Sequence, residues 1–119
     1  MVLEYEHMLK ITHYAEILKA PVYIVHMSIG RGVEVVNRAR SRGVELYVET
    51  CPHYLSLTSD RPLGKVGPPL RSKDDIEMLW STVKARIINT ISPDHAPMSL
   101  EKKKGKGDIW SIGSRSMHR

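Results

Sequence analysis

The chain has 119 residues and a mass of 13.5 kDa, which fits one modest domain, because single domains usually run to about 100–150 residues. Its composition, 41% hydrophobic and 26% charged with no Phe, excludes a wholly disordered chain and requires a core of aliphatic side chains. No apolar run approaches the ~18–20 residues that span a bilayer, and acidic residues interrupt the first ten positions, so we expect neither a membrane segment nor a secretory signal.

The net charge of +5 is concentrated near the C-terminus. From Glu101 onward six Lys or Arg residues accompany two acidic residues, a net charge of +4, which leaves +1 for residues 1–100. We therefore expect a domain over 1–100 that does not select nucleic acid by charge, and a basic, flexible tail over 101–119. A nucleic-acid-binding tail is an alternative, and its binding would fall steeply with salt.

The single cysteine, Cys51, cannot form an intrachain disulfide, which is typical of a reducing compartment, so we expect a cytoplasmic protein. His53 lies two residues further on, and a thiolate nucleophile is one interpretation of that spacing. Adjacent side chains at the end of a strand point in different directions, and no acid that could orient the histidine follows. Both observations favour Cys51 as a small packing residue.

The first half of the chain predicts two helix–strand pairs. Apolar residues at spacings of three and four predict a helix from about residue 3 to 19, and Pro21 stops it; the apolar face is Met8, Ile11, Ala15 and Leu18. Residues 22–25 form a continuous apolar run, the pattern of a strand covered on both faces. A second helix is predicted between Gly32 and Gly43, and a second strand over residues 44–50.

The second half begins with a long loop over residues 54–71, in which Lys65 and Val66 could form a very short strand. Ser72, followed by Asp75 three residues later, resembles a capping box and predicts the start of a helix. The apolar positions of that helix are Ile76, Leu79, Trp80, Val83 and Ile87, and a final short strand is predicted over residues 88–91.

This alternation of helices and strands predicts an α/β fold with a parallel sheet. His26, His53 and Asp94 each follow a predicted strand, and the carboxyl ends of parallel strands are where ligand-binding groups gather. Two imidazoles and a carboxylate suit Zn²⁺ or a similar divalent ion. The alternative for each histidine is a hydrogen-bonded structural residue, which is the commoner role of a lone histidine after a strand.

Four short segments resemble successive motifs of the cyclic amidohydrolases, the family of dihydropyrimidinases, hydantoinases, allantoinases and dihydroorotases. They are PVYIVHMS at 21–28, ETCPHYL at 49–55, KVGPPLR at 65–71 and DHAP at 94–97, and their order and approximate spacing match as well. GDIW at 107–110 resembles a further family segment. The resemblance favours the hydantoinase and dihydropyrimidinase branch, because Gly67 stands where dihydroorotases are expected to carry Asn.

The resemblance implies a partial, half TIM-like (β/α)8 barrel with strands corresponding to barrel strands 5–8, and a pair of metal ions, usually zinc. It implies that His26 and His53 are metal ligands after the fifth and sixth strands. Gly67 would contact substrate after the seventh strand, and Asp94, after the eighth, would be both a ligand and the catalytic proton acceptor. Apart from the resemblance, two interpretations of His95 stay open, a residue that hydrogen-bonds to the site and one that faces solvent. We expect Arg71 to hold the long loop in place rather than to contact substrate.

The family also requires a His-x-His pair and a lysine, after a strand, that bridges the two metals. This chain has no His-x-His, and neither Lys10 nor Lys19 lies at the end of an apolar strand. We therefore expect a fragment of a hydrolase that opens cyclic amides, with an incomplete metal site from which the metal could be absent. A half barrel leaves unpaired strand edges, which favours a homo-oligomer or a complementing half-barrel chain as partner. The alternative is a non-catalytic remnant or an oligomerisation module of the same fold.

Overall fold

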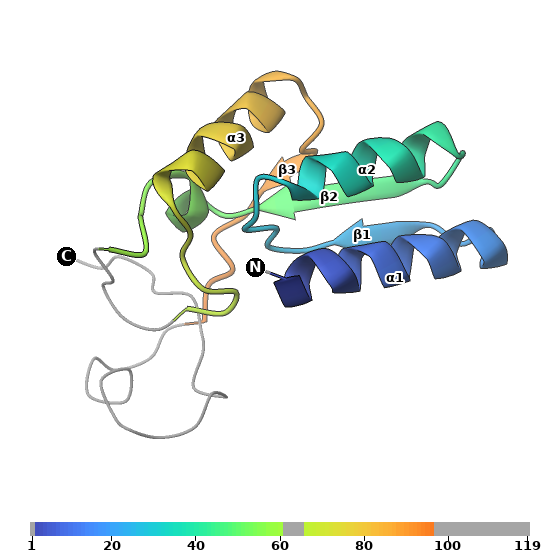
Figure 1. Cartoon of the computed structure of the whole chain (residues 1–119), viewed down its shortest axis with the longest axis horizontal. Helices are drawn as coiled ribbons and strands as arrows, with labels where there is room; N and C mark the ends of the chain where they lie inside the picture. Colours follow the sequence, from blue (N-terminus) through green and yellow to red (C-terminus); the bar gives the residue numbers. More distant parts are fainter. Residues whose placement is uncertain (1, 61–65, 97–119) are drawn as a thin grey trace.

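The computed structural model describes residues 2–60 and 66–96, and the predicted tail over 101–119 lies outside them. Figure 1 shows helices packed beside a small sheet. The elements in chain order are α1 (Val2–Leu18), β1 (Val22–Ile24), α2 (Gly32–Ser41), β2 (Leu46–Thr50), the 3-10 helix η1 (Pro52–Leu55), α3 (Lys73–Lys84) and β3 (Thr90–Ile91). The three predicted helices and the strands predicted over 22–25, 44–50 and 88–91 are thus present, and η1 occupies the start of the predicted loop.

The three strands form a parallel sheet in the order β1-β2-β3. Tyr23 pairs with Tyr47 between β1 and β2, and Glu49 pairs with Thr90 between β2 and β3. The parallel α/β prediction is confirmed. The strand considered at Lys65 and Val66 is not confirmed. Val66 lies in no strand, and Lys65 lies outside the described residues. In addition, β2 pairs directly with β3. The described residues therefore hold three strands, and the strand considered at Lys65 and Val66 would have been a fourth.

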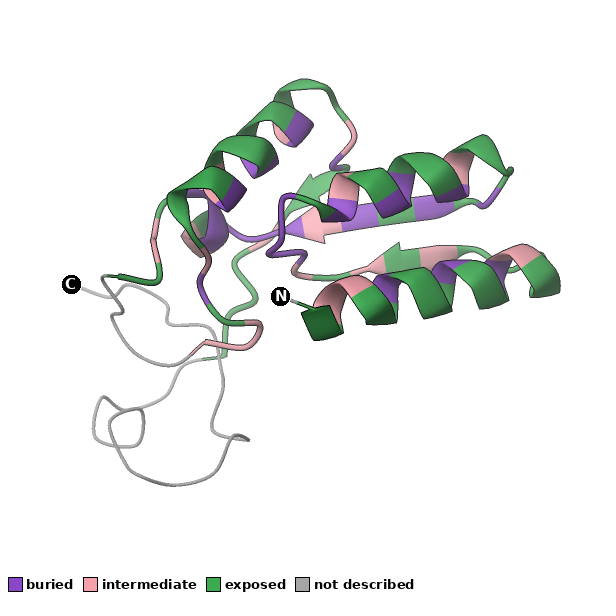
Figure 2. Cartoon of the chain, viewed as in Figure 1, coloured by how far each residue is buried: buried purple, intermediate pink, exposed green. Residues whose placement is uncertain are grey.

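The core lies between β2 and the helices. Leu46, Val48 and Thr50 of β2 are buried, whereas Tyr47 between them is 43% exposed, which is the alternation of a strand with one covered face. Val35 and Val36 of α2 are buried as well, and α2 packs against β2. Figure 2 shows buried residues along β2 and on part of α2. Burial of these aliphatic side chains supplies most of the favourable free energy of folding.

Two predictions about the first helix–strand pair are wrong. β1 is not covered on both faces, because Tyr23 and Val25 remain 49% and 46% exposed and no described element packs over them. On α1, Met8 and Ala15 are buried as predicted, but Ile11 and Leu18 are 44% and 72% exposed. α1 is apolar around much of its circumference, so its periodicity did not reveal which side α2 and β1 would cover.

Ser72 caps α3 as predicted. Its hydroxyl oxygen accepts a hydrogen bond from the Asp75 backbone N–H at 3.3 Å, and the hydroxyl donates to the Asp75 carboxylate at 3.0 Å. The same carboxylate accepts from the Gly30 backbone N–H at 2.9 Å, so the cap also joins α3 to the loop that follows β1. A Cβ at position 30 would collide with the Met78 side chain, which makes glycine necessary at this contact.

Arg40 connects α2 to the sheet. Its guanidinium donates to the carbonyls of Leu46 and Ile87 and to the Asn89 side chain, at 2.7–3.0 Å. The Asn89 side-chain oxygen also accepts from the Val48 N–H, so one polar network joins α2, β2 and the approach to β3. Partial burial lowers the pKa of Arg40 below its ordinary value.

The described helices include none that is long and apolar enough to cross a membrane.

Candidate functional site

Two of the three predicted metal ligands share an unusual backbone conformation. His26 has a φ of 43° and Asp94 a φ of 46°, both in the left-handed region that residues other than glycine rarely adopt. Lys19 and Arg86 also have positive φ, but each lies at the end of a helix, where such a residue commonly stops the helix. His26 and Asp94 instead follow strands, and strained residues at strand ends are a feature of functional sites.

His53, the third predicted ligand, lies on η1 directly after β2. Its Nε2 atom is buried, and its ring lies 4.1 Å from the ring of Tyr54, measured between centroids. The Tyr54 hydroxyl donates a hydrogen bond to the Pro68 carbonyl at 2.7 Å, which fixes the turn that contains Gly67 against the end of β2. Burial raises the pKa of the Tyr54 hydroxyl, so this donor keeps its proton across the physiological range.

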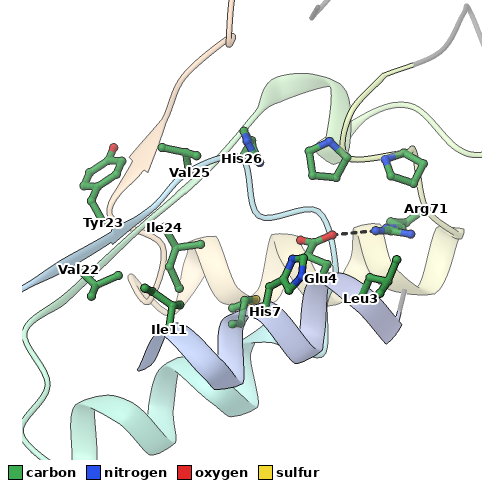
Figure 3. A pocket seen from close by; sticks show the side chains of 13 residues that line it. Leu3, Glu4, His7, Ile11, Val22, Tyr23, Ile24, Val25, His26 and Arg71 are labelled. Carbon is green, nitrogen blue, oxygen red and sulfur yellow. Dashed lines mark hydrogen bonds and ion pairs between the residues drawn. The ribbon is translucent and has the colours of Figure 1, made fainter. Parts of the chain in front are cut away.

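A hollow of ≈ 520 Å³ lies between α1 and the edge of β1 that no described strand pairs with (Figure 3). Its walls are mostly apolar, and His26 and Arg71 lie at the end nearest the carboxyl end of β1. Pro68 and Pro69 of the turn after Gly67 also line it. The hollow therefore joins the first and third of the resembling motifs, although the 36 residues 29–64 lie between the two segments in the sequence.

An ion pair between Glu4 and Arg71 closes the end of this hollow (Figure 3). Arg71 Nη2 lies 2.7 Å from Glu4 Oε2, and the two side chains are only 12% and 15% exposed. Ser28 completes the group: its N–H and its hydroxyl donate to the Glu4 carboxylate, and its hydroxyl oxygen accepts from Arg71 Nε at 2.9 Å. We call Glu4, Ser28 and Arg71 the clamp.

The clamp joins the start of α1, the loop after β1 and the segment before α3. The predicted role of Arg71, holding the long loop, is confirmed by these contacts. Sequence reasoning missed Glu4, because a glutamate in the first turn of a helix is common and carries no signal of a partner 67 residues away. Ser28 lies within the resembling motif at 21–28, and its place in that motif was the sequence signal that could have pointed to it.

Cys51 is a packing residue. It is fully buried, and burial together with the negative charges of Asp94 and Glu49 raises the pKa of its thiol from 9.0 to about 12. A thiol with that pKa stays protonated near neutral pH, so the nucleophile interpretation is not supported.

The structure does not gather the predicted ligands into a metal centre. Across residues 2–60 and 66–96, no group of three His, Cys, Asp or Glu side chains is arranged to hold a metal ion. His26 is half-buried at the rim of the hollow, Asp94 and His95 are exposed, and Gly67 is half-buried beside the hollow. His26, His53 and Asp94 therefore do not form a three-ligand group in the described part of the chain, and their role as ligands remains a prediction.

Comparison with known proteins relates the chain to the cyclic amidohydrolases. It is 40% identical over 104 residues to a dihydroorotase from Ruminiclostridium cellulolyticum, a match that covers 83% of this chain and 24% of that enzyme. An allantoinase from Rubrobacter xylanophilus is 41% identical over 100 residues, covering 80% of this chain and 22% of that enzyme. A D-hydantoinase from Ralstonia pickettii is 39% identical over 108 residues, covering 82% of this chain and 24% of the enzyme. No family model matches the chain.

Solved structures agree with the sequence matches. Two D-hydantoinase structures superpose on 95% of this chain with a TM-score of 0.83 each, at 29% and 36% identity, and the chain covers 27% of each. A dihydropyrimidinase from Brevibacillus agri superposes on 94% with a TM-score of 0.80. The chain thus shares the fold of a segment of these enzymes, and it spans about a quarter of the length of the curated relatives it matches.

Proposed function

We propose that residues 1–119 supply one part of the active site of a hydantoinase-like or dihydropyrimidinase-like hydrolase that opens cyclic amides. The parts they supply are His26, His53 and Asp94 as ligands of a divalent metal such as zinc, Gly67 as a substrate contact and His95 as a neighbour of the ligands. The missing ligands come from outside this chain. The observation that carries the proposal is the left-handed conformation of His26 and Asp94 at strand ends, in a chain related to three such enzymes.

We propose no catalytic step for the chain alone, because His26, His53 and Asp94 do not form a metal-binding group in the described residues. Parallel α/β enzymes collect their site from the ends of several strands, and the described residues hold three. A site of that kind is incomplete until further strands contribute. We also propose that the protein is cytoplasmic, because its single cysteine is a buried free thiol and thiols stay reduced in the cytoplasm.

The second candidate function is a non-catalytic role as a remnant or assembly module of the same fold. The absence of a three-ligand group among the described residues favours it. The two candidates differ in what happens when the rest of an enzyme is provided. An active-site segment supports turnover there, whereas a remnant folds into place without supporting turnover.

A chimera tests the proposal. The 108-residue match in the Ralstonia pickettii D-hydantoinase would be replaced by this chain, and zinc content and hydantoin hydrolysis would be measured. We expect bound zinc and ring opening above the level of the His26→Ala chimera, because His26 supplies a ligand. That variant should lose hydrolysis by at least about a hundredfold, because mutating a group that only supports a metal ligand already costs about 10–100-fold in affinity or activity.

His13→Ala is the matched control, because His13 is exposed on α1 and does not line the hollow. Its chimera should keep both zinc and activity. A chimera that unfolds cooperatively, binds no zinc and leaves hydantoin intact would establish the non-catalytic candidate instead.

A further inference from the structure

The clamp connects the two segments that carry the proposed ligand His26 and the proposed substrate contact Gly67. Ser28 lies two residues after His26, and Arg71 lies four residues after Gly67. Arg71 Nε donates to the Ser28 hydroxyl oxygen at 2.9 Å, so this hydrogen bond joins the loop after β1 directly to the segment before α3. Glu4 accepts from both residues, which closes a ring of three mutual contacts.

The loop after β1 is also anchored on the sheet. The Met27 N–H donates to the Glu49 carbonyl at 2.8 Å, and the Met27 carbonyl accepts from the Thr50 hydroxyl at 2.7 Å. Met27 is 1% exposed, so the core holds its side chain as well. A residue in the left-handed region keeps that conformation where its surroundings fix it, and these contacts directly after His26 do so.

The turn at Gly67 is held by a different set of partners. The Tyr54 hydroxyl donates to the Pro68 carbonyl at 2.7 Å, and the Ser59 N–H donates to the Arg71 carbonyl at 2.9 Å. Both bonds run to η1 and the residues after it, whereas the Arg71 side chain runs to the loop after β1. That side chain therefore sets the turn against the loop, at the end of the hollow that both segments line.

We propose that Arg71 is a positioning residue, which through the clamp fixes the Gly67 turn in its place relative to His26. The inference rests on the proposed function, since it concerns how the substrate contact is placed beside a metal ligand. A guanidinium suits this role because its Nε and Nη2 atoms bond two different residues in a fixed plane. A lysine ammonium would keep the attraction to Glu4 without that fixed geometry, so the two residues separate positioning from charge pairing.

The first experiment uses the free 119-residue chain and needs no turnover. Amide NMR signals are compared between the parent chain and two variants, Arg71→Lys and Glu4→Gln. We expect both variants to shift the Gly67 amide signal, although Glu4 lies in a different element of the fold. The amide signals of Val36 and Leu79, which are fully buried in the core, should stay in place.

Arg42→Lys is the matched control. Arg42 also pairs with a glutamate of α1, Glu16, at 3.1 Å, but its side chain is 49% exposed and lies outside the hollow. The control should leave the Gly67 signal unchanged. The proposal is overturned if Glu4→Gln leaves the Gly67 signal in place. It is also overturned if both clamp variants lose the core signals, since the clamp would then only stabilise the fold.

The second experiment measures kinetics in the Ralstonia pickettii chimera. Arg71→Lys should raise KM for hydantoin at least about tenfold while kcat falls less, because a displaced turn weakens substrate binding. Zinc content should stay at the parent level, since Met27 keeps His26 in place on the sheet. Loss of zinc with an unchanged KM would contradict the proposal. A parent chimera without hydrolysis would reject the proposed function, and the Gly67 signal of the free chain would still decide the role of the clamp.

Discussion

At the scale of single residues, the clamp is a polar cluster in which the Glu4 carboxylate accepts hydrogen bonds from Ser28 and Arg71. Glu4, Ser28 and Arg71 come from three segments and are linked by bonds of 2.5–2.9 Å. Taking an ion pair partly out of water costs free energy, so its net contribution is modest, but removal of one partner leaves the other charge unpaired. The clamp therefore fixes the end of the hollow more than it raises overall stability.

Arg71→Met should lower the free energy of unfolding by about 2–4 kcal/mol, because the Glu4 carboxylate then stays nearly buried without its cation. Glu4→Leu combined with Arg71→Met should cost less than the two single changes together. Urea denaturation measures both effects. Lys10→Met, which breaks the exposed Glu6–Lys10 pair, should cause no measurable change. Additive effects of the Glu4 and Arg71 changes would contradict a coupled clamp.

At the scale of elements, α3 is held by its first turn. The Ser72 cap satisfies the Asp75 N–H, and Asp75 in turn binds Gly30 after β1. Leu79 is fully buried and Trp80 donates its Nε1–H to the Leu55 carbonyl at 2.9 Å, so α3 also packs on η1. The helix thus bridges the ends of β1 and β2, where His26 and His53 lie.

Ser72→Ala should lower the free energy of unfolding by about 1 kcal/mol, through the lost cap. Ser81→Ala in the same helix is the matched control: Ser81 is exposed, its hydroxyl bonds only the Glu77 carbonyl one turn back, and alanine is the better helix former. Its effect should be close to zero or slightly stabilising, as measured by thermal or urea denaturation. Equal losses from both variants would show that the cap carries no special weight.

At the scale of the whole molecule, folding raises the pKa of two buried side chains, Cys51 and Tyr54. The pKa of the Cys51 thiol is raised to about 12, and that of the Tyr54 hydroxyl is raised as well, both mainly by burial. In the unfolded chain these groups lose their protons at lower pH than in the folded chain. Their contribution to stability is therefore fully present below about pH 9 and is lost as pH rises toward 12.

The free energy of unfolding should fall steadily with pH between 9 and 12, and the fall should be shallower in Cys51→Ala, which removes one of the responsible groups. Urea denaturation at several alkaline pH values measures the slope. Tyr14→Phe, at an exposed hydroxyl, is the control and should keep the parent slope. An identical slope in Cys51→Ala would mean that the thiol ionises alike in the folded and unfolded chains.

Periodicity along the chain was enough to predict the helices, the parallel sheet and the cap at Ser72, since these depend on local spacing and on residues within one turn. The resemblance of four short motifs was enough to predict the relation to cyclic amidohydrolases. The order of His26, His53 and Asp94 at strand ends followed from the same local pattern, because parallel strands place their carboxyl ends at one edge.

The tertiary structure alone decided which surfaces are covered. It left Tyr23, Val25 and Ile11 exposed, paired β2 directly with β3, brought Glu4 to Arg71 across 67 residues, and did not gather three metal ligands in the described part of the chain. Local spacing determines an element because the interacting groups are close in sequence. Burial and ion pairing depend on which distant segments pack together, and among the described residues no strand pairs with the outer edge of β1 and part of the apolar surface of α1 stays exposed.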